Sequence, residues 1–259
     1  MEVKIDFTKS AQENANDYYN KSKRLAHKAE GAQRTIAELE KRLEEEKKVH
    51  IEKEKSKVKK IRKREWYERF HWFNTAQGML AISGRDAKQN ERLNADYFED
   101  GDLFFHADIF GASVVILKGG VNADDASKRE TAQFAASYSS AWENMQKSVD
   151  VYAMRREQVS KATAKGSLGT GSFLLIGERE WFRNTTLGLA FYCEDDRLYA
   201  VPLLAVERLG LKHYVIVTQG QKKKSDVAKE IAREFDYDDL DYVMQQLPAG
   251  TMSAERFKK

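Results

Sequence analysis

Apolar residues in the first quarter of the chain recur mostly at threes and fours, which is the spacing of one face of a helix. The pattern begins at Thr8, beside Thr and Ser residues that can cap a helix, and continues to about Arg69. Its later part is a heptad-like seam flanked by Glu and Lys. We therefore predict a coiled-coil arm over residues 1–69, whose apolar face is formed by Ala11, Ala15, Tyr18, Leu25, Ala29, Ala32, Ile36, Leu39 and Leu43.

Two arrangements of the arm fit this pattern: a single long helix, or an antiparallel hairpin with a turn somewhere after Gly31. The apolar content falls between Glu44 and Lys60, so this stretch buries too little surface to be stable alone. A hairpin gives the seam a partner within the chain, and we predict that form. Dimerisation through the seam is the alternative, which makes the arm a possible homodimer contact.

The rest of the chain mixes short apolar runs with amphipathic stretches. Five aromatic residues fall between positions 66 and 73, and we interpret them as the plug of a hydrophobic core. The run 112–120 is solidly apolar, which predicts a strand that is central in its sheet or buried on both faces. Other strands are predicted at 79–83, 102–110, 148–154, 172–177 and 213–219, and a hairpin at 187–204 around the turn residues Glu-Asp-Asp.

Helices are predicted from Asp86 to about Phe98, over 124–145, over 225–235, and in a last short stretch that ends at Pro248. In the helix over 124–145 we expect a buried stripe of Phe134, Tyr138, Trp142 and Met145. For the helix over 225–235 we expect Ser225 or Asp226 as the cap.

These elements define a fold class and a domain organisation. Strands and helices are mixed without strict alternation, so the class is α+β, with an N-terminal helical arm followed by a mixed α+β globular part. The boundaries that we predict are 1–69 for the arm, 70–185 for a first globular domain, and 186–259 for a C-terminal extension of β-hairpin and helix packed on it.

Composition narrows the classes of protein further. Of the 259 residues 33% are charged, and the mean hydropathy is −0.68, which agrees with part of the length being solvated helix. Cys193 is the only cysteine, so no disulfide framework, metal cluster or redox pair can be built, and we expect a buried structural thiol. The histidines show no ligand spacing, so we expect no metal and no cofactor. The N-terminus lacks the apolar core of a signal peptide, and no apolar run could span a bilayer, so we expect a cytoplasmic protein without a membrane partner.

The net charge of +3 matters less than its distribution. Basic residues dominate 53–64, and Lys222, Lys223 and Lys224 form a second basic cluster before a predicted helix. Lys161 and Lys165 stand in a loop with three glycines, where backbone amides could also hold a phosphate, although neither the Walker nor the dinucleotide spacing is present. Each of these segments is equally compatible with an ordinary solvated surface or connection. Together they favour a polyanion over one small ligand.

The segment Ser-Gly-Arg-Asp-Ala-Lys-Gln-Asn begins the helix after the first strand. Asp86 and Gln89 have the spacing of a capping box, which explains both residues without any function. Capping does not explain Arg85 and Lys88. A helix start has unpaired N–H groups and the positive end of the dipole, so two cations beside it would suit a phosphate.

His106 and Asp108 lie two residues apart, on one side of a strand if the strand stays regular. This pair permits a general-base hypothesis, but no nucleophile stands at a recognisable spacing. A His106 that is oriented by a neighbour and donates to a backbone, base or phosphate requires fewer assumptions.

Three segments, 70–93, 102–118 and 158–177, resemble the signature blocks of the NFACT-R domain, in the right order. That domain belongs to the NFACT family of ribosome-associated quality control, and residues 5–24 resemble the start of the family's middle coiled coil. The resemblance implies RNA binding without covalent chemistry, so we expect no enzyme. The candidate RNA-binding residues are Arg85, Asp86, Lys88, Gln89, Asn90, His106, Asp108, Lys118, Gln158, Lys161, Lys165, Lys222, Lys223 and Lys224.

The same resemblance implies partners: tRNA, rRNA, a large ribosomal subunit that carries a stalled nascent chain, and a protein partner that binds the arm. Family members support the C-terminal tailing of stalled chains. The sequence begins at the coil, so we expect either an excised fragment or a shortened natural form, which alone does not support tailing.

This chain departs from the family pattern at several positions: Ser83 replaces the usual Gly, Phe110 a common His, and Val151 and Tyr152 frequent tryptophans. Two alternative functions stay open, a coiled-coil adaptor that recruits a partner, and an RNA-processing enzyme that uses His106 and Asp108.

Overall fold

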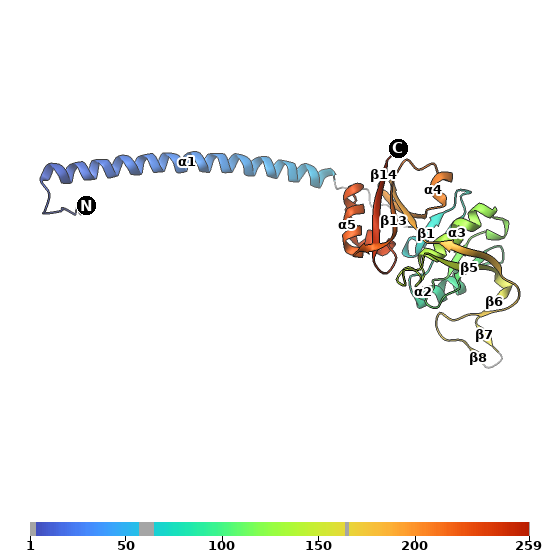
Figure 1. Cartoon of the computed structure of the whole chain (residues 1–259). Coiled ribbons are helices and arrows are strands. Elements are labelled where there is room, and N and C mark those ends of the chain that lie inside the picture. Colours follow the sequence, from blue (N-terminus) through green and yellow to red (C-terminus); the bar gives the residue numbers. More distant parts are fainter. Residues whose placement is uncertain (1–3, 57–64, 164–165, 259) are drawn as a thin grey trace. The chain divides into compact units, whose positions relative to one another are not determined.

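The computed structural model describes residues 4–56, 65–163 and 166–258. The chain divides into two compact units, Met1–Lys63 and Arg64–Lys259 (Figure 1). We call the second the globular unit. Each unit has its own architecture.

The first unit consists mainly of one continuous helix, α1 (Ala11–Ser56), so the predicted hairpin with a turn after Gly31 is wrong. A glycine inside a helix costs only about 1 kcal/mol relative to alanine, which is too little to end a helix of otherwise favourable residues. An ion pair between Glu30 and Arg34, at 2.7 Å, also spans the glycine. The predicted Ser cap is confirmed: the Ser10 hydroxyl accepts from the Glu13 N–H at 3.3 Å, and the Glu13 carboxylate accepts from the Ser10 N–H at 2.7 Å.

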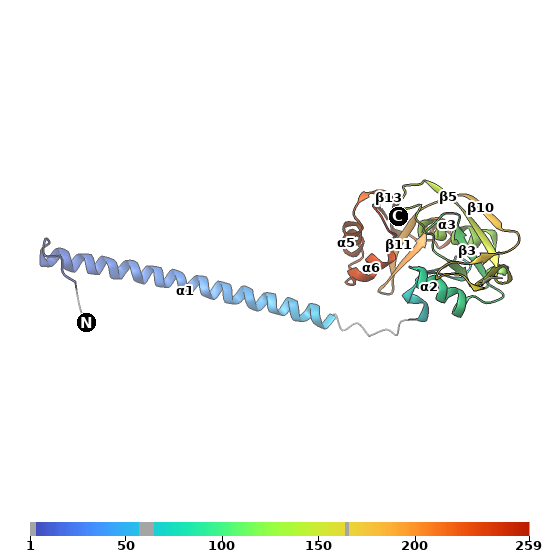
Figure 2. The same cartoon turned by 90° about the horizontal axis from the view of Figure 1, so that it is seen from below.

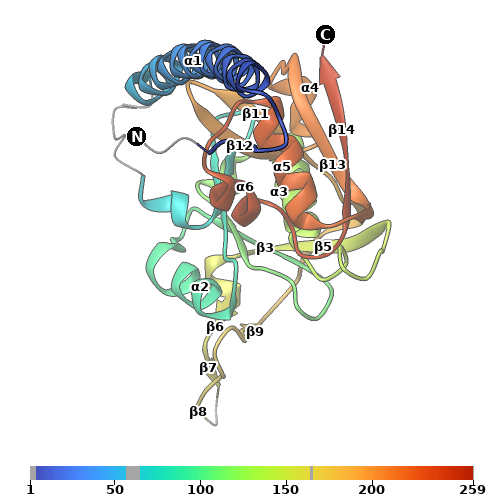
Figure 3. The ribbon, with the colours of Figure 1, turned by 90° about the vertical axis from the view of Figure 1, so that its left-hand side faces the viewer.

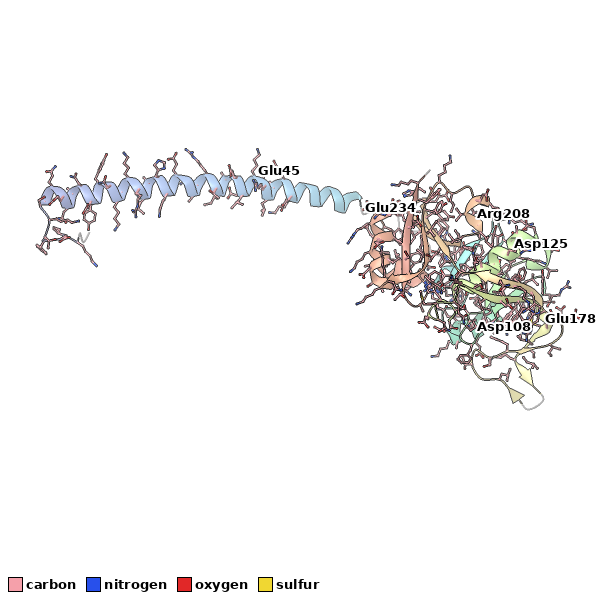
Figure 4. All side chains as sticks on the ribbon, viewed as in Figure 1. Glu45, Asp108, Asp125, Glu178, Arg208 and Glu234 are labelled. Carbon is pink, nitrogen blue, oxygen red and sulfur yellow. The ribbon has the colours of Figure 1, made fainter. Side chains whose placement is uncertain are left out.

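The apolar seam of α1 has no cover within its own unit. Leu25, Ile36, Leu39 and Leu43 are each more than half exposed. Figure 4 draws side chains on every side of this helix, with Glu45 labelled toward its C-terminal end. The homodimer through this seam therefore stays a prediction.

The globular unit is built on a six-stranded antiparallel sheet with the order β1-β2-β4-β3-β5-β10. Within the run 112–120, predicted as a central strand, Val115–Leu117 forms β4 between β2 and β3, and these three residues are fully buried. The strands are β1 (His71–Asn74), β2 (Leu80–Ser83), β3 (Leu103–Ala107), β4 (Val115–Leu117), β5 (Ser148–Arg155) and β10 (Glu180–Thr186).

Side chains alternate between the two faces of this sheet. Phe105 belongs to the larger core, which includes helix α3 (Asp125–Ser137) and the second sheet, whereas Phe104 belongs to a smaller core on the other face. Helix α2 (Ala87–Arg92) and the π-helical turn η2 (Leu93–Tyr97) follow β2, and Leu93 packs into the smaller core. The sheet is therefore buried on both faces.

A second antiparallel sheet has the order β12-β11-β13-β14. The predicted hairpin is confirmed, because β11 and β12 pair around Asp195 and Asp196, which both have positive φ. Figure 2 shows helices α5 and α6 next to each other at the side of this sheet. The elements are β11 (Leu189–Glu194), β12 (Arg197–Pro202), α4 (Ala205–Arg208), β13 (His213–Lys222), α5 (Lys224–Glu234), α6 (Leu240–Gln246) and β14 (Met252–Lys258).

The glycine-rich segment after β5 forms two small hairpins. In the view of Figure 3 the outer hairpin, formed by strands β7 and β8, extends away from the rest of the globular unit. The predicted strand 172–177 shortens to β9. The short elements are η1 (Trp66–Arg69), η3 (Gly120–Asn122) and η4 (Arg156–Gln158), and the pairs β6 (Val159–Ser160) with β9 (Leu174–Leu175) and β7 (Ala162–Thr163) with β8 (Gly166–Ser167).

The predicted helix over 124–145 is too long. Helix α3 ends at Ser137, where the Ser139 hydroxyl donates to the Ala136 carbonyl and so competes with helical bonding. Phe134, Tyr138 and Trp142 are buried as predicted, but Met145 is exposed and has positive φ, so its place in the buried stripe is wrong.

Candidate functional site

Three segments that are distant along the chain, together with Tyr152 of β5, line one cleft of about 500 Å³, which we call the aromatic cleft. They are the start of α2, strand β3 with the loop that follows it, and the loop before β9. Their lining residues are Arg85, Asp86, Ala87, Asn90, Phe104, His106, Ile109, Phe110, Gly111, Ala112, Ser113, Tyr152, Thr170, Gly171, Ser172, Phe173 and Leu175. Most of these residues come from the three sequence blocks, so the fold brings the blocks together.

At the start of α2, Asp86 caps the helix by accepting from the Gln89 N–H at 2.8 Å, as the spacing predicts. The Gln89 side chain accepts from the N–H of Arg85, at 3.1 Å, instead of that of Asp86. Both residues therefore have local structural partners. Lys88 is exposed, and its side chain has no hydrogen-bond or ion-pair partner among the described residues.

The Arg85 guanidinium is turned toward the protein. It donates to Gln245 Oε1 at 2.9 Å and to the Phe70 carbonyl at 3.1 Å, and burial lowers the pKa of the group. No carboxylate of the described residues lies within ion-pair distance of it. Arg85 is thus a half-buried cation without a counter-charge, in the wall of the cleft.

Asn90 helps to hold the backbone at Val114 and lies close to the backbone of Gly84. It is buried, and its Oδ1 accepts from the Val114 N–H at 3.2 Å. A Cβ at Gly84 would lie 2.2 Å from this oxygen and 2.8 Å from the Asn90 nitrogen, so the glycine permits the close approach. As an RNA-contacting residue Asn90 remains a prediction.

His106 and Asp108 contact different partners. His106 Nδ1 hydrogen-bonds the Tyr152 hydroxyl at 3.2 Å, while Asp108 lies 3.8 Å from Arg179. Strand β3 ends at Ala107, so the regular-strand premise for the pair is wrong. Burial lowers the pKa of His106, and the backbone contacts at Ala107 and Ala112 and the charge of Asp108 only partly oppose it, so the imidazole is neutral at pH 7.

Phe110 is the most exposed large apolar residue of the described chain, at 99%. It precedes Gly111, whose φ of +83° turns the loop, and the Ser140 hydroxyl donates to the Phe110 carbonyl at 2.6 Å. The backbone is therefore held while the ring lies in solvent at the rim of the cleft. The sequence indicated Phe110 only as a departure from the family pattern, not as a functional residue.

Strand β10 and Arg179, the residue before it, add cations beside aromatic rings next to this region. The Arg179 guanidinium lies 4.5 Å from the Tyr152 ring, and that of Arg183 lies 3.8 Å from the Trp181 ring. These residues were missed because no strand was predicted there. Asp108 and Glu178, labelled in Figure 4, lie well away from Glu234 of α5.

Several predicted RNA-binding residues in the loops hold the fold together. The Lys118 ammonium donates to Asp102, Glu99 and the Tyr97 carbonyl at 2.5, 2.8 and 2.8 Å; burial lowers its pKa, but the two carboxylates outweigh burial and raise it. Gln158 accepts from the Arg155 N–H and donates to the Glu178 carbonyl, at 2.8 and 2.7 Å.

Lys161 has a similar role within the glycine-rich loop. Its ammonium donates to the Gly169 carbonyl at 2.8 Å and lies 3.2 Å from Glu91 and 5.4 Å from the Phe173 ring. It therefore ties the loop to α2. Lys165 lies outside the described residues, as do the side chains of the basic run 53–64.

The three lysines of the second basic cluster differ in their surroundings. Lys222 pairs with Glu230 at 2.8 Å, Lys223 is exposed, and Lys224 donates to the Leu247 carbonyl at 2.8 Å. The predicted cap at Ser225 or Asp226 is wrong: α5 begins at Lys224 because the N–H groups of Asp226 and Val227 already bond to the Lys223 carbonyl.

Cys193 is half-buried on β11, so the expectation of a buried thiol is wrong. Over the described ranges, no cluster of three or more His, Cys, Asp or Glu side chains is arranged to hold a metal ion. Within the same ranges, no helix is both long and apolar enough to cross a membrane.

Comparison with known proteins identifies several relatives. Residues 69–177 match the family model described as the NFACT protein RNA binding domain. The archaeal Rqc2 homolog aRqcH of Methanocaldococcus jannaschii is 37% identical over 202 residues, which are 74% of this chain and 30% of that protein. The ribosome quality control complex subunit NEMF homolog of Drosophila melanogaster is 33% identical over 205 residues, 75% of this chain and 20% of that protein.

This chain spans less than a third of either relative. Among solved structures, the C-terminal part of the fibronectin/fibrinogen-binding protein from Streptococcus suis is similar over 49% of this chain and 48% of that one. The TM-score is 0.40 and the sequence identity 25%.

Proposed function

Because this chain belongs to the NFACT family, we propose that its globular unit binds tRNA and large-subunit rRNA as part of a ribosome quality control factor. The unit acts by binding and performs no covalent step. Its contribution to the tailing of stalled nascent chains is to hold RNA in place on the large subunit. The remaining functions belong to the longer assembly.

The observation that carries this proposal is the aromatic cleft with Phe110 exposed at its rim. Unpaired RNA bases stack on exposed aromatic rings, and a stacked base contributes about 1–3 kcal/mol. The cleft also offers a neutral His106, the backbone of Gly111 and Gly171, and serine and threonine hydroxyls. Such groups suit the bases and sugars of a loop or single strand better than the phosphates of a duplex.

Few of the predicted RNA-binding lysines on the surface are available for phosphates. Lys118, Lys161 and Lys222 are engaged by carboxylates, whereas Lys88 is exposed without a carboxylate partner in the described part of the chain. We therefore expect a shallow salt dependence. If about 2–4 phosphates are contacted, the logarithm of affinity falls with the logarithm of salt by about 0.7 per contact.

The experiment is a titration of tRNA, and co-sedimentation with purified large subunits, using the whole chain and four variants. Phe110→Ala weakens binding about tenfold, since a stacked base is lost, while Leu204→Ala removes a half-exposed apolar side chain from α4's N-cap and changes nothing. Lys88→Glu weakens binding and flattens the salt slope, while Lys212→Glu, also exposed, does neither. Equal affinity of wild type and the Phe110→Ala variant would contradict the proposal.

A second candidate, a partner-binding arm, is favoured by the exposed seam of α1. We propose that α1 contacts a protein partner or a second copy of the chain through Ile36, Leu39 and Leu43. Replacing Leu39 and Leu43 by Lys should abolish such self-association in analytical ultracentrifugation and leave tRNA binding intact. A loss of tRNA binding in this variant would contradict a separate role for the arm.

The enzymatic alternative finds less support in the geometry, because His106 and Asp108 have different partners. Incubation of tRNA with the protein followed by gel analysis tests it. We expect intact RNA, and cleavage that disappears in the His106→Gln variant would restore this alternative.

A further inference from the structure

A second cleft of about 580 Å³ shares one wall with the aromatic cleft and opens toward the C-terminal part of the globular unit. We call it the lysine cleft, because Lys224 of α5 lies in its wall. Arg85 and Phe110 line both clefts. The volume is within the range of small-molecule sites, about 300–1,000 Å³. The lining also includes His71, Tyr138, Glu143, Gln245 and Leu247.

Two cations meet in this cleft without a counter-charge. The Lys224 ammonium has a carbonyl partner, Leu247 at 2.8 Å, and the Arg85 guanidinium has a carbonyl and an amide. Neither has a carboxylate within ion-pair distance among the residues of 65–163 and 166–258. Burial lowers the pKa of Lys224, and the charge of Arg85 lowers it further, so the two groups repel each other.

Unsatisfied nitrogen atoms accompany these charges. His71 is only 6% exposed and stacks on Tyr138 with 3.9 Å between ring centroids. Its Nδ1 and the Nε of Arg85 are buried without a hydrogen-bond partner in the described structure. Buried polar atoms are normally bonded, so this wall of the cleft lacks hydrogen-bond partners for two nitrogen atoms as well as counter-charges for its two cations.

An anion would complete this site. Lys224 has two ammonium hydrogens beyond the one it donates to Leu247, and Arg85 has donors to spare, so a tetrahedral oxyanion can accept from both. Helix α5 adds an uncapped N-terminus at the same place. The one carboxylate of the lining, Glu143, is exposed and forms no ion pair with either cation.

We propose that the lysine cleft binds a phosphate group between Lys224 and Arg85, with the base of the same nucleotide against the exposed ring of Phe110. The phosphate site stands on its own geometry, whereas its occupation by RNA rests on the proposed function. The phosphate belongs either to the end of an RNA or to its backbone. Free inorganic phosphate shares the same chemistry and is the third source.

The test compares two adjacent lysines of equal charge. Wild type, Lys224→Met and Lys223→Met are titrated calorimetrically with inorganic phosphate, with a diuridine that carries a 5′-phosphate, and with the same diuridine without it. Lys223 is exposed outside the lining of the cleft, so it controls for net charge. Lys224→Met weakens binding of the phosphorylated diuridine about tenfold, because a charge-assisted bond is lost, and Lys223→Met changes it less than about twofold.

The ligands separate the possible sources. A terminal phosphate predicts tighter binding of the phosphorylated diuridine than of the unphosphorylated one, and a backbone phosphate predicts equal binding of both, in each case with the same loss in Lys224→Met. If inorganic phosphate is the only ligand that binds, and Lys224→Met weakens its binding, the anion site is supported. The proposed contact of a nucleotide base with Phe110 is then contradicted. Lys224→Arg keeps the charge and retains binding, which guards against a folding defect in Lys224→Met.

The proposal is overturned if Lys223→Met and Lys224→Met have equal effects, or if none of the three ligands binds. The proposed function survives that result as long as tRNA binding remains sensitive to Phe110→Ala. The converse result is phosphate binding that depends on Lys224 while neither Lys224→Met nor Phe110→Ala changes the affinity for tRNA. That result would contradict the RNA function and leave the anion site supported.

Discussion

Gly84 shows how a single residue positions the start of α2. A side chain there would meet the Oδ1 and backbone nitrogen of Asn90, and through Asn90 it would disturb the bond to Val114. We expect Gly84→Ala to lower the free energy of unfolding by about 1–3 kcal/mol, the usual cost of an added methyl group that forces a backbone shift. Urea unfolding measures this.

Gly101→Ala is the matched control, because nothing lies within 4 Å of the position of its Cβ. It should change the stability by less than about 0.5 kcal/mol. Equal stability of both variants would show that α2 adjusts freely, and the close approach of Gly84 to Asn90 would then have no structural importance.

The burial of His71 should make the free energy of unfolding depend on pH. Burial, with a smaller contribution from Arg85, holds its pKa well below the ordinary value. In the unfolded chain the pKa is about 6.5, so below that pH the unfolded state gains a proton that the folded state does not. Stability therefore falls as pH falls below about 6.5, by at most about 1.4 kcal/mol per pH unit for this site, until the folded pKa is reached.

The variant His71→Phe keeps a ring against Tyr138 and removes the proton site. Urea unfolding at about pH 7.5 and about pH 5 should show a smaller loss of stability in the variant than in wild type. His106, whose pKa is also lowered, titrates in both proteins and so cancels in the comparison. Parallel pH profiles would show that His71 is protonated in the folded state.

At the scale of elements, Lys118 connects the turn before β3 to the end of β4. It pairs with Asp102, which is only 3% exposed. Lys118→Met leaves this buried carboxylate without its cation, and we expect a loss of about 2–3 kcal/mol in urea unfolding. Lys128→Met removes a lysine whose partner Glu180 is half exposed, and should cost less than about 1 kcal/mol.

The affinity of the Lys118→Met variant for tRNA separates a structural role of Lys118 from a contact with RNA. If Lys118 only supports the fold, the folded Lys118→Met protein binds tRNA with wild-type affinity. Unchanged stability with weakened tRNA binding would favour the original prediction of an RNA-contacting lysine.

The sequence predicts an element best when residues close together in the chain determine that element. The α2 cap needs only the three-residue spacing of Asp86 and Gln89, and β4 needs only a continuous apolar run. Strands β10 and β14 were missed because they lie at sheet edges and are mostly exposed, so their patterns lack a buried face. The hairpin prediction for α1 failed because it assumed that an apolar seam must find a partner within the chain.

At the scale of the whole molecule, the candidate site was only partly predictable. The three sequence blocks do meet at the aromatic cleft. The contact of Arg85 with Gln245, however, joins residues 160 positions apart, and no local pattern indicates such a pairing. Lys224 was predicted as one of three similar lysines, yet only the fold distinguishes it by placing it in the same cleft as Arg85.

The boundary that we predict between residues 185 and 186 has a consequence for folding. One hydrophobic core contains residues from both sides of it: Phe134 of α3 on one side, and Leu189, Phe191, Val215 and Val217 on the other. Burying each of these side chains contributes about 1.5–3 kcal/mol, and a whole domain is stable by only about 5–15 kcal/mol. We propose that the C-terminal extension is an integral part of the globular unit.

Two truncated proteins test this proposal. The fragment 64–259 should unfold cooperatively with the urea midpoint of the same unit in the full chain, because the arm and the globular unit are separate compact units. The fragment 64–185 should show no cooperative transition, since it exposes the face of α3 that packs against β12. A cooperative transition of 64–185 would mean that the first globular domain folds alone, and that Lys224 reaches Arg85 only by the docking of a separate module.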